Sequence, residues 1–237
     1  VNARVKTYLA EYDMRYAIDV TKSLRASFAF RQDKDIFLAS DTFSLHELQK
    51  PVKEDWGQFR LEYVFDNTIP VQLNILNGTR YKFYFEAQKM FDAKKITMLN
   101  FGVDFRNYFK LHRQITLASR FAAATSFGKA KVAYFLGGTE NWIDVPTKMW
   151  NADTKVDDKA GYYYQTLETN LRGFQQNIRN GNSFALLNEE IRFPVFTYLF
   201  NTPIRSELIK NFQLVPFFDI GTAWQGKSPY EIGRAHV

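Results

Sequence analysis

The chain has 237 residues, of which 46% are hydrophobic and 24% are charged, with a net charge of +6 and no cysteine. No apolar stretch approaches the ~20 residues of a transmembrane helix. The basic residues are spread along the chain and form no run of the kind that nucleic-acid-binding proteins carry. The composition therefore argues against a helical membrane protein and against nucleic acid as a partner.

Aromatic residues are frequent, at 17% of the chain, yet the mean hydropathy is only −0.34. A transmembrane β-barrel reconciles the two values, because lipid-facing apolar residues alternate with polar residues that face the lumen. A soluble β-sandwich can share this composition, so composition alone leaves both architectures open.

Eight segments alternate between apolar and polar residues with the period of two that indicates β-strands. In the first segment, Tyr8, Tyr12 and Tyr16 share one face, and Glu11 and Asp13 share the other. The segments cover residues 8–19, 24–31, 58–66, 80–88, 99–106, 114–125, 184–196 and 212–224. Most have about 9–13 residues, near the ~9–11 that a tilted strand needs to cross a bilayer. This length and the charge on the polar face favour a barrel.

The connections between these segments alternate between short and long. Residues 21–23 and 110–113 form tight turns, whereas residues 32–55 and 126–182 are long and polar. Short turns at one end and long loops at the other are typical of outer-membrane barrels. The loop after Phe91 is short and departs from this pattern.

One charged residue lies on the apolar face of the seventh segment. If Glu190 and Arg192 face the lumen, Glu189 faces lipid, where a charge is costly except near the membrane surface. We therefore expect Glu189 either close to the edge of the membrane or at a local β-bulge.

Both ends of the sequence look artificial. The chain begins at Val1 without an initiator Met or a signal peptide, and we expect a longer protein to precede it. Residues 231–237 read like a translated sequencing adaptor, and we treat them as an artefact. Residues 1–230 are then expected to form one partial outer-membrane β-barrel domain, with a long loop over about residues 126–183 folded into the lumen.

Three short motifs in the last third of the chain carry the functional argument. They are Asn170-Leu171-Arg172-Gly173-Phe174 in the long loop, Glu190-Ile191-Arg192-Phe193-Pro194 in the seventh segment and Phe217-Phe218-Asp219-Ile220-Gly221 in the eighth. Arg172 can form bidentate hydrogen bonds with a carboxylate, Gly173 allows a tight tip, and Phe174 can pack against the inner wall. Glu190 and Asp219 lie on the polar faces of neighbouring strands. We therefore expect both carboxylates to bind Arg172 and to hold the loop inside the barrel.

The motifs resemble those of the BamA-like outer-membrane assembly factors. In that family a loop arginine engages a Glu on the following strand and the Asp of a Phe-x-Asp-x-Gly strand. The matching positions are Arg172, Glu190 and Asp219, with Gly137, Gly138, Arg192, Phe217 and Gly221 as supporting positions. The resemblance covers about residues 4–230 and identifies the eight segments with strands six to thirteen of a sixteen-stranded barrel. The departure is an expanded loop over residues 142–168.

The resemblance implies a role in the bacterial outer membrane, either the insertion of other β-barrel proteins or the translocation of proteins. The implied partners are the lipid bilayer, unfolded outer-membrane client proteins and periplasmic accessory proteins. It implies no enzymatic activity, no cofactor and no metal. Because strands are missing at both ends, we expect an all-β, antiparallel, open curved sheet with the long loop against its concave face.

Several alternatives belong to other functional classes. A two-partner secretion transporter shares the motifs, and a passive barrel anchor would carry an upstream passenger domain. A soluble β-sandwich binding module would pack its apolar faces against each other. Paired carboxylates also suggest a glycosidase, but a neighbouring arginine favours ionised carboxylates, which opposes a general-acid role.

Overall fold

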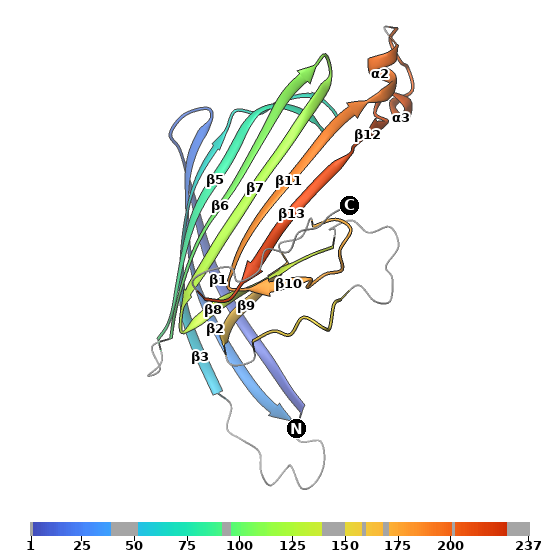
Figure 1. Ribbon diagram of the computed structural model, residues 1–237. Helices are drawn as coiled ribbons and strands as arrows, with labels where there is room; N and C mark the ends of the chain where they lie inside the picture. The colour runs from blue at the N-terminus through green and yellow to red at the C-terminus, as the bar shows by residue number, and fades with distance from the viewer. Residues whose placement is uncertain are drawn as a thin grey trace.

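The chain folds into a large antiparallel sheet (Figure 1). The computed structural model describes residues 2–38, 52–91, 96–138, 150–157, 160–167, 171–200 and 202–226. The long strands are β1 (Asn2–Ala17), β2 (Lys22–Leu38), β3 (Val52–Asp66), β5 (Ile75–Met90), β6 (Thr97–His112), β7 (Ile115–Gly128), β11 (Ser183–Pro194) and β13 (Phe217–Trp224). Each pairs with the next one in chain order, and the short strands β4 (Ile69–Gln72) and β12 (Gln213–Leu214) pair with β5 and β11. The all-β prediction is confirmed.

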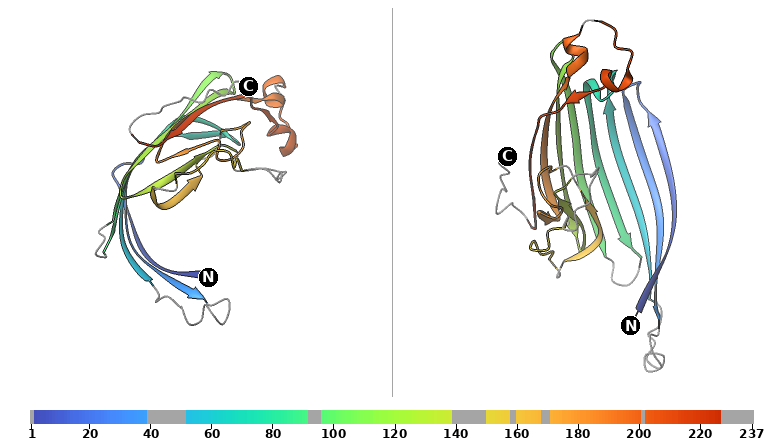
Figure 2. Two further views of the ribbon diagram at one scale, coloured as in Figure 1. Left: turned by 60° about the horizontal axis from the view of Figure 1, so that its bottom comes forward. Right: turned by 90° about the vertical axis from the view of Figure 1, so that its right-hand side faces the viewer.

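The sheet is an open arc rather than a closed barrel (Figure 2). Its edges are β1 and β13, and no pairing between them closes it. The prediction of an open curved sheet is confirmed, and each of the eight predicted segments overlaps one of the long strands.

The predicted strand lengths were too short. The six strands from β1 to β7 that follow the sheet order have 14–17 residues. The alternating pattern is visible only in the part of a strand that carries apolar residues. The backbone pairing between strands continues through polar ends such as Asp33 to Asp35 of β2. The seventh segment ends two residues early, at Pro194, and the eighth is interrupted at residues 215–216, because proline has no N–H to donate to a ladder.

The two faces of the sheet differ in chemistry. The convex face is apolar, and among the described residues no second layer packs on it: Tyr12 is 65% exposed, Phe83 54% and Phe101 46%. The concave face carries charged residues that pair with one another, such as Arg60 with Glu62 at 2.6 Å. The apolar face is therefore bare, the opposite of the face-to-face apolar packing expected of a sandwich.

A second, three-stranded sheet lies against the concave face (Figure 2). It consists of β8 (Ala130–Leu136), β9 (Gly161–Leu167) and β10 (Arg179–Gly181), in the order β10-β8-β9 with β8 and β9 parallel. We call it the loop sheet. The prediction treated residues 126–183 as one loop, so this sheet is a correction. The expanded segment 142–168 contributes β9, and its residues 142–149, 158–159 and 168 lie outside the described ranges.

The main core lies between the loop sheet and the concave wall rather than within a sandwich. Its fully buried members include Met98 on β6, Tyr134 and Leu136 on β8, and Leu186 on β11. Small side chains on β7, such as Ala122, let the loop sheet approach the wall closely. The loop sheet is therefore held by apolar packing as well as by polar contacts.

One end of the sheet carries the short turns, and we call it the short-turn end (Figure 1). It holds the connections β1–β2, β4–β5 and β6–β7. It also holds two short helices between β11 and β12, namely α2 (Val195–Leu199) and α3 (Glu207–Lys210). The sequence did not predict these helices, because four or five residues are too few to show a helical period.

Glu189 lies on the convex face, as its parity predicts. It is opposite Ser119 of β7, whose hydroxyl donates a 2.6 Å hydrogen bond to the carboxylate. The ladder between β11 and β7 runs without a register shift from residue 183 to residue 192, so the bulge alternative is wrong. Its partner Ser119 is the fifth residue of β7, so Glu189 lies towards the short-turn end of the sheet.

Candidate functional site

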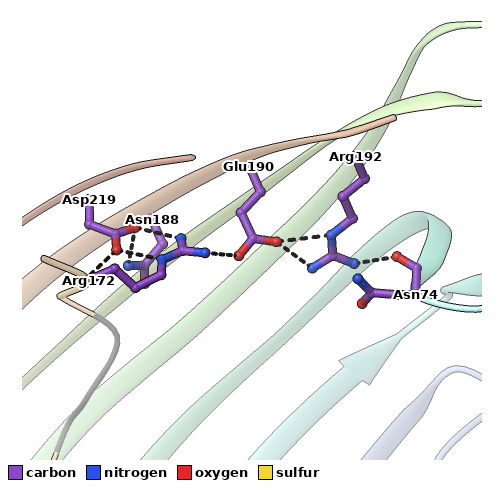
Figure 3. A network of polar contacts seen from close by, with 6 residues as sticks. All are labelled: Asn74, Arg172, Asn188, Glu190, Arg192 and Asp219. Atoms are coloured by element: carbon purple, nitrogen blue, oxygen red, sulfur yellow. Dashed lines mark hydrogen bonds and ion pairs between the residues drawn. The ribbon is translucent and has the colours of Figure 1, made fainter. Parts of the chain in front are cut away.

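Arg172 is clamped between two strands of the wall (Figure 3). Its Nη1 donates to Glu190 Oε1 at 2.6 Å, and its Nη2 donates to Asp219 Oδ1 at 2.7 Å. Nε and the backbone N–H of the same residue donate to Asp219 Oδ2 at 2.8 and 2.9 Å. The structure thus brings together the three residues that the motifs single out. We call this arrangement the arginine dock.

Asp219 is the most deeply placed member of the dock. Its side chain is only 2% exposed, against 20% for Arg172 and 21% for Glu190. Asn188 donates to its Oδ1 at 2.8 Å, so the buried carboxylate accepts four hydrogen bonds in all. A buried charge is tolerated when it is paired and fully hydrogen-bonded, and Asp219 meets both conditions.

The guanidinium of Arg172 also lies over an aromatic ring. Its central carbon is 4.0 Å from the ring centroid of Phe217, a cation–π geometry. The hydrogen bond to Asp219 raises the pKa of Arg172 above its ordinary value. The side chain is therefore fixed as a cation, with polar partners at its edges and an apolar partner on its face.

The polar network continues beyond the dock to the short-turn end (Figure 3). Glu190 accepts from Arg192 Nε and Nη2 through its second oxygen, at 3.0 and 2.9 Å. Arg192 Nη1 then donates to the backbone carbonyl of Asn74, at 2.7 Å. Asn74 lies in the β4–β5 turn with a positive φ of 60°. One chain of contacts therefore joins the loop tip, the wall and this turn.

Glycines allow the loop to approach so closely. Gly173 has a φ of 86°, which favours glycine, and it follows the dock arginine directly. At Gly137, with a φ of 121°, a Cβ would lie 2.0 Å from the carbonyl oxygen of Gln175. The backbone N–H of the neighbouring Gly138 donates a 2.9 Å hydrogen bond to the Phe174 carbonyl. The glycine pair thus fastens the strand β8 to the segment that carries the dock.

Leu171 is an anchor that the motif reading missed. It is 4% exposed and belongs to the main core, whereas Phe174 packs against that core only in part. A Cβ at Gly221 would lie 2.8 Å from its Cδ1, so glycine at that position makes room for it. In the sequence, the burial of Leu171 is indicated only by an apolar residue placed directly before the charged Arg172 of the motif.

Tyrosines fix the loop sheet to the wall at a second place. Tyr134 donates to Asn100 Oδ1 at 2.8 Å, and Tyr164 donates to Glu86 Oε2 at 3.0 Å. Gln58 donates to the hydroxyl of Tyr163 at 2.9 Å. Burial raises the pKa of both Tyr134 and Tyr164, so both remain neutral donors. Tyr134, Tyr163 and Tyr164 therefore hold the loop sheet against the wall through their hydroxyl groups.

The dock is suited to holding a segment in place. Both carboxylates accept hydrogen bonds from the Arg172 guanidinium, so each of them takes part in fixing the loop to the wall. The described residues contain no group of three or more His, Cys, Asp or Glu side chains placed to hold a metal ion. Within the same described ranges, no helix is long and apolar enough to cross a membrane.

Two further residues, His112 and Trp150, make aromatic contacts away from the dock. His112 lies beside Tyr198, with 3.2 Å between the hydroxyl and Nδ1, and the exposed ring of Trp150 packs on Phe135. His46, Trp142, Asn170 and residues 227–237, including the suspected adaptor, lie outside the described residues.

Compared with known proteins, the chain matches no protein-family model and no curated protein.

Proposed function

We propose that this chain forms the central wall of an outer-membrane β-barrel of the BamA-like family, which inserts or translocates other proteins. The observation that carries the proposal is the arginine dock, because a loop arginine meets a Glu on the following strand and an Asp on the strand beyond it. The bare apolar convex face supports the location, since a lipid bilayer is the surroundings that it suits.

The concave face supports the same proposal from the other side. Its charges form local pairs, as where Asp104 binds Arg106 and Arg120 at 2.8 and 2.9 Å. Paired charges on a wall facing water are what a solvated lumen contains. In this role the dock keeps the loop sheet against β11 and β13, and so keeps the lumen partly filled.

The membrane location is tested by lipid quenching along one strand. The chain has no cysteine, so a single introduced cysteine carries the only thiol label. We expect a fluorophore at Phe83→Cys to be quenched by lipids with quencher-bearing acyl chains, and one at Lys82→Cys not to be, because adjacent residues face opposite sides. Equal quenching at the two positions would contradict a lipid-facing wall.

The assembly role is tested on the parent protein. Sequencing the parent DNA on both sides of this segment should reveal small periplasmic α/β domains upstream and further strands downstream. The parent protein in vesicles should then accelerate the folding of an unfolded outer-membrane β-barrel, and Arg172→Ala should reduce that acceleration. An enzyme or propeller domain upstream would instead identify the barrel as an anchor or exporter.

A further inference from the structure

Glu189 presents a carboxylate on the apolar convex face. This carboxylate accepts a hydrogen bond from the Ser119 hydroxyl, and no Lys or Arg among the described residues pairs with it. Its neighbours on the same face are Leu187 and Ile191 along β11 and Phe218 on β13. An ionisable side chain on a face that suits lipid is costly unless another charge compensates it. The described part of the chain therefore supplies no counter-ion for Glu189.

An apolar hollow lies on the same face, nearer the middle of the sheet. It has a volume of about 600 Å³, and its lining includes the small side chains of Ala123 and Ala185 and the rings of Phe83 and Phe101. Ala123 of β7 and Ala185 of β11 are directly paired, so the hollow lies where two small side chains meet. Side chains that line a depression gain van der Waals contacts when an apolar group fills it. A flexible acyl chain is such a group.

The carboxylate and the hollow belong to one surface. The ladder between β11 and β7 has no register shift over residues 183–192, so Ala185, Leu187 and Glu189 point to the same side. Four residues of strand separate Ala185 from Glu189, which is about 14 Å at ~3.4 Å per residue. At a strand tilt of ~40° this is roughly 11 Å of depth, less than the ~15 Å half-thickness of the hydrocarbon core. One lipid molecule can therefore reach both.

The position of Glu189 along the sheet fits the edge of the hydrocarbon. On β7, Phe127 and Ser119 are eight residues apart, which is about 21 Å of depth at a tilt of ~40°. This is close to the ~25 Å height of the apolar band of a transmembrane barrel. Asn107 of β6 lies beside Ser119, and Thr79 of β5 lies beside Asn107. Polar side chains of four neighbouring strands thus form one row that includes Glu189.

We infer that this surface binds one phospholipid whose head group carries a primary ammonium, as in phosphatidylethanolamine. The inference rests on the proposed function, because it requires the convex face to lie in lipid. A primary ammonium has three N–H donors and a positive charge, which complement the carboxylate of Glu189. The quaternary ammonium of phosphatidylcholine has no N–H to donate. We call Ser119, Ala123, Ala185 and Glu189 the lipid site, in which the hollow receives an acyl chain.

The inference is tested with brominated lipids in bilayers of one composition. This chain is reconstituted in vesicles of phosphatidylethanolamine and phosphatidylcholine in equal parts, and the acyl-chain bromines, which quench fluorescence, are placed on one lipid at a time. A fluorophore at Phe105→Cys reports the lipid site, because residue 105 lies in the row of Leu187. A separate label at Phe28→Cys reports the convex face on β2. We expect brominated phosphatidylethanolamine to quench the label at residue 105 more strongly than brominated phosphatidylcholine, and both lipids to quench the label at residue 28 equally.

Glu189→Gln should remove this preference. An exposed ion pair strengthens binding by about fivefold at most, so we expect a preference of about threefold in the unchanged chain and none in the variant. Ala185→Phe, which fills the hollow, should lower the preference as well. Glu11→Gln is the matched control, because it removes an exposed carboxylate from the concave side of β1 and should leave the preference unchanged.

The outcomes separate this inference from the proposed function. If neither lipid quenches the label at residue 28, the convex face does not lie in lipid, and the proposed function fails together with the inference. If that label is quenched but both lipids are kept from residue 105, another molecule, such as a second copy of the chain, covers the lipid site and only the inference is overturned. Equal quenching of residue 105 by the two lipids, or an unchanged preference in Glu189→Gln or Ala185→Phe, would also overturn the inference and leave the membrane wall in place.

Discussion

Replacing Arg172 by alanine is the most direct perturbation of the arginine dock. The substitution removes three side-chain hydrogen bonds and leaves Asp219 with the backbone N–H of residue 172 and with Asn188. Removing one partner of a buried ion pair costs about 3–5 kcal/mol. Because Arg172 and Glu190 are each about one-fifth exposed, we expect the lower end of this range.

A loss of ~3 kcal/mol corresponds to a roughly 150-fold rise in the open population of the loop. Amide hydrogen exchange of the inserted protein measures that population in β8 and β10. We expect protection there to fall about a hundredfold while β5 and β6 stay protected. Lys155→Ala is the matched control, because Lys155 is an exposed loop cation outside the dock. Unchanged protection of β8 in the Arg172 variant would refute the idea that the dock holds the loop.

Three further substitutions or conditions test parts of the same arrangement. Gly221→Val should loosen the loop by about 1–3 kcal/mol, because its side chain overlaps Leu171, and the same exchange experiment measures the effect. Asp219→Asn should reduce the exchange protection of the loop sheet about tenfold more than Glu190→Gln, because Asp219 is the more buried acceptor. Hydrogen bonds to charged groups contribute ~1.5–3 kcal/mol each. Equal losses in the two variants would contradict the larger role assigned to Asp219. Burial raises the pKa of Tyr134, so the docked loop sheet favours the neutral hydroxyl. Docking of the loop sheet is therefore stable below the ordinary tyrosine pKa of 10.0 and weakens as the pH rises above it. Absorbance titration of tyrosinate, compared between the unchanged chain and Tyr134→Phe, checks this.

The strands could be predicted because their signal is local. Alternating aromatic and charged residues, as in the segment around Phe83, determine which face is apolar without reference to the rest of the fold. The three dock residues could be found because a resemblance linked motifs that lie far apart in sequence. Arg172 and Asp219 are separated by 47 positions, and neither motif alone predicts their contact.

Other features depend on the curvature of the sheet and on long-range packing. Asn74 meets Arg192 across 118 positions because the β4–β5 turn bends towards β11, and no local pattern encodes that bend. The parallel pairing of β8 and β9 includes a register shift near Tyr163, which masks the alternation of apolar residues. The loop therefore looks irregular in sequence although it contains a sheet.

The contact between Arg192 and Asn74 has a thermodynamic consequence for the two ends of the molecule. Gln213 and Gln72 add two further hydrogen bonds between the β4–β5 turn and the segment after β11, each of 2.7 Å. Glu190 uses one oxygen for the loop arginine and the other for the arginine that holds the turn. If displacing the turn weakens the loop, linkage requires that releasing the loop weakens the turn by the same free energy. A molecule that binds at either end would then be sensed at the other through Arg172, Glu190 and Arg192.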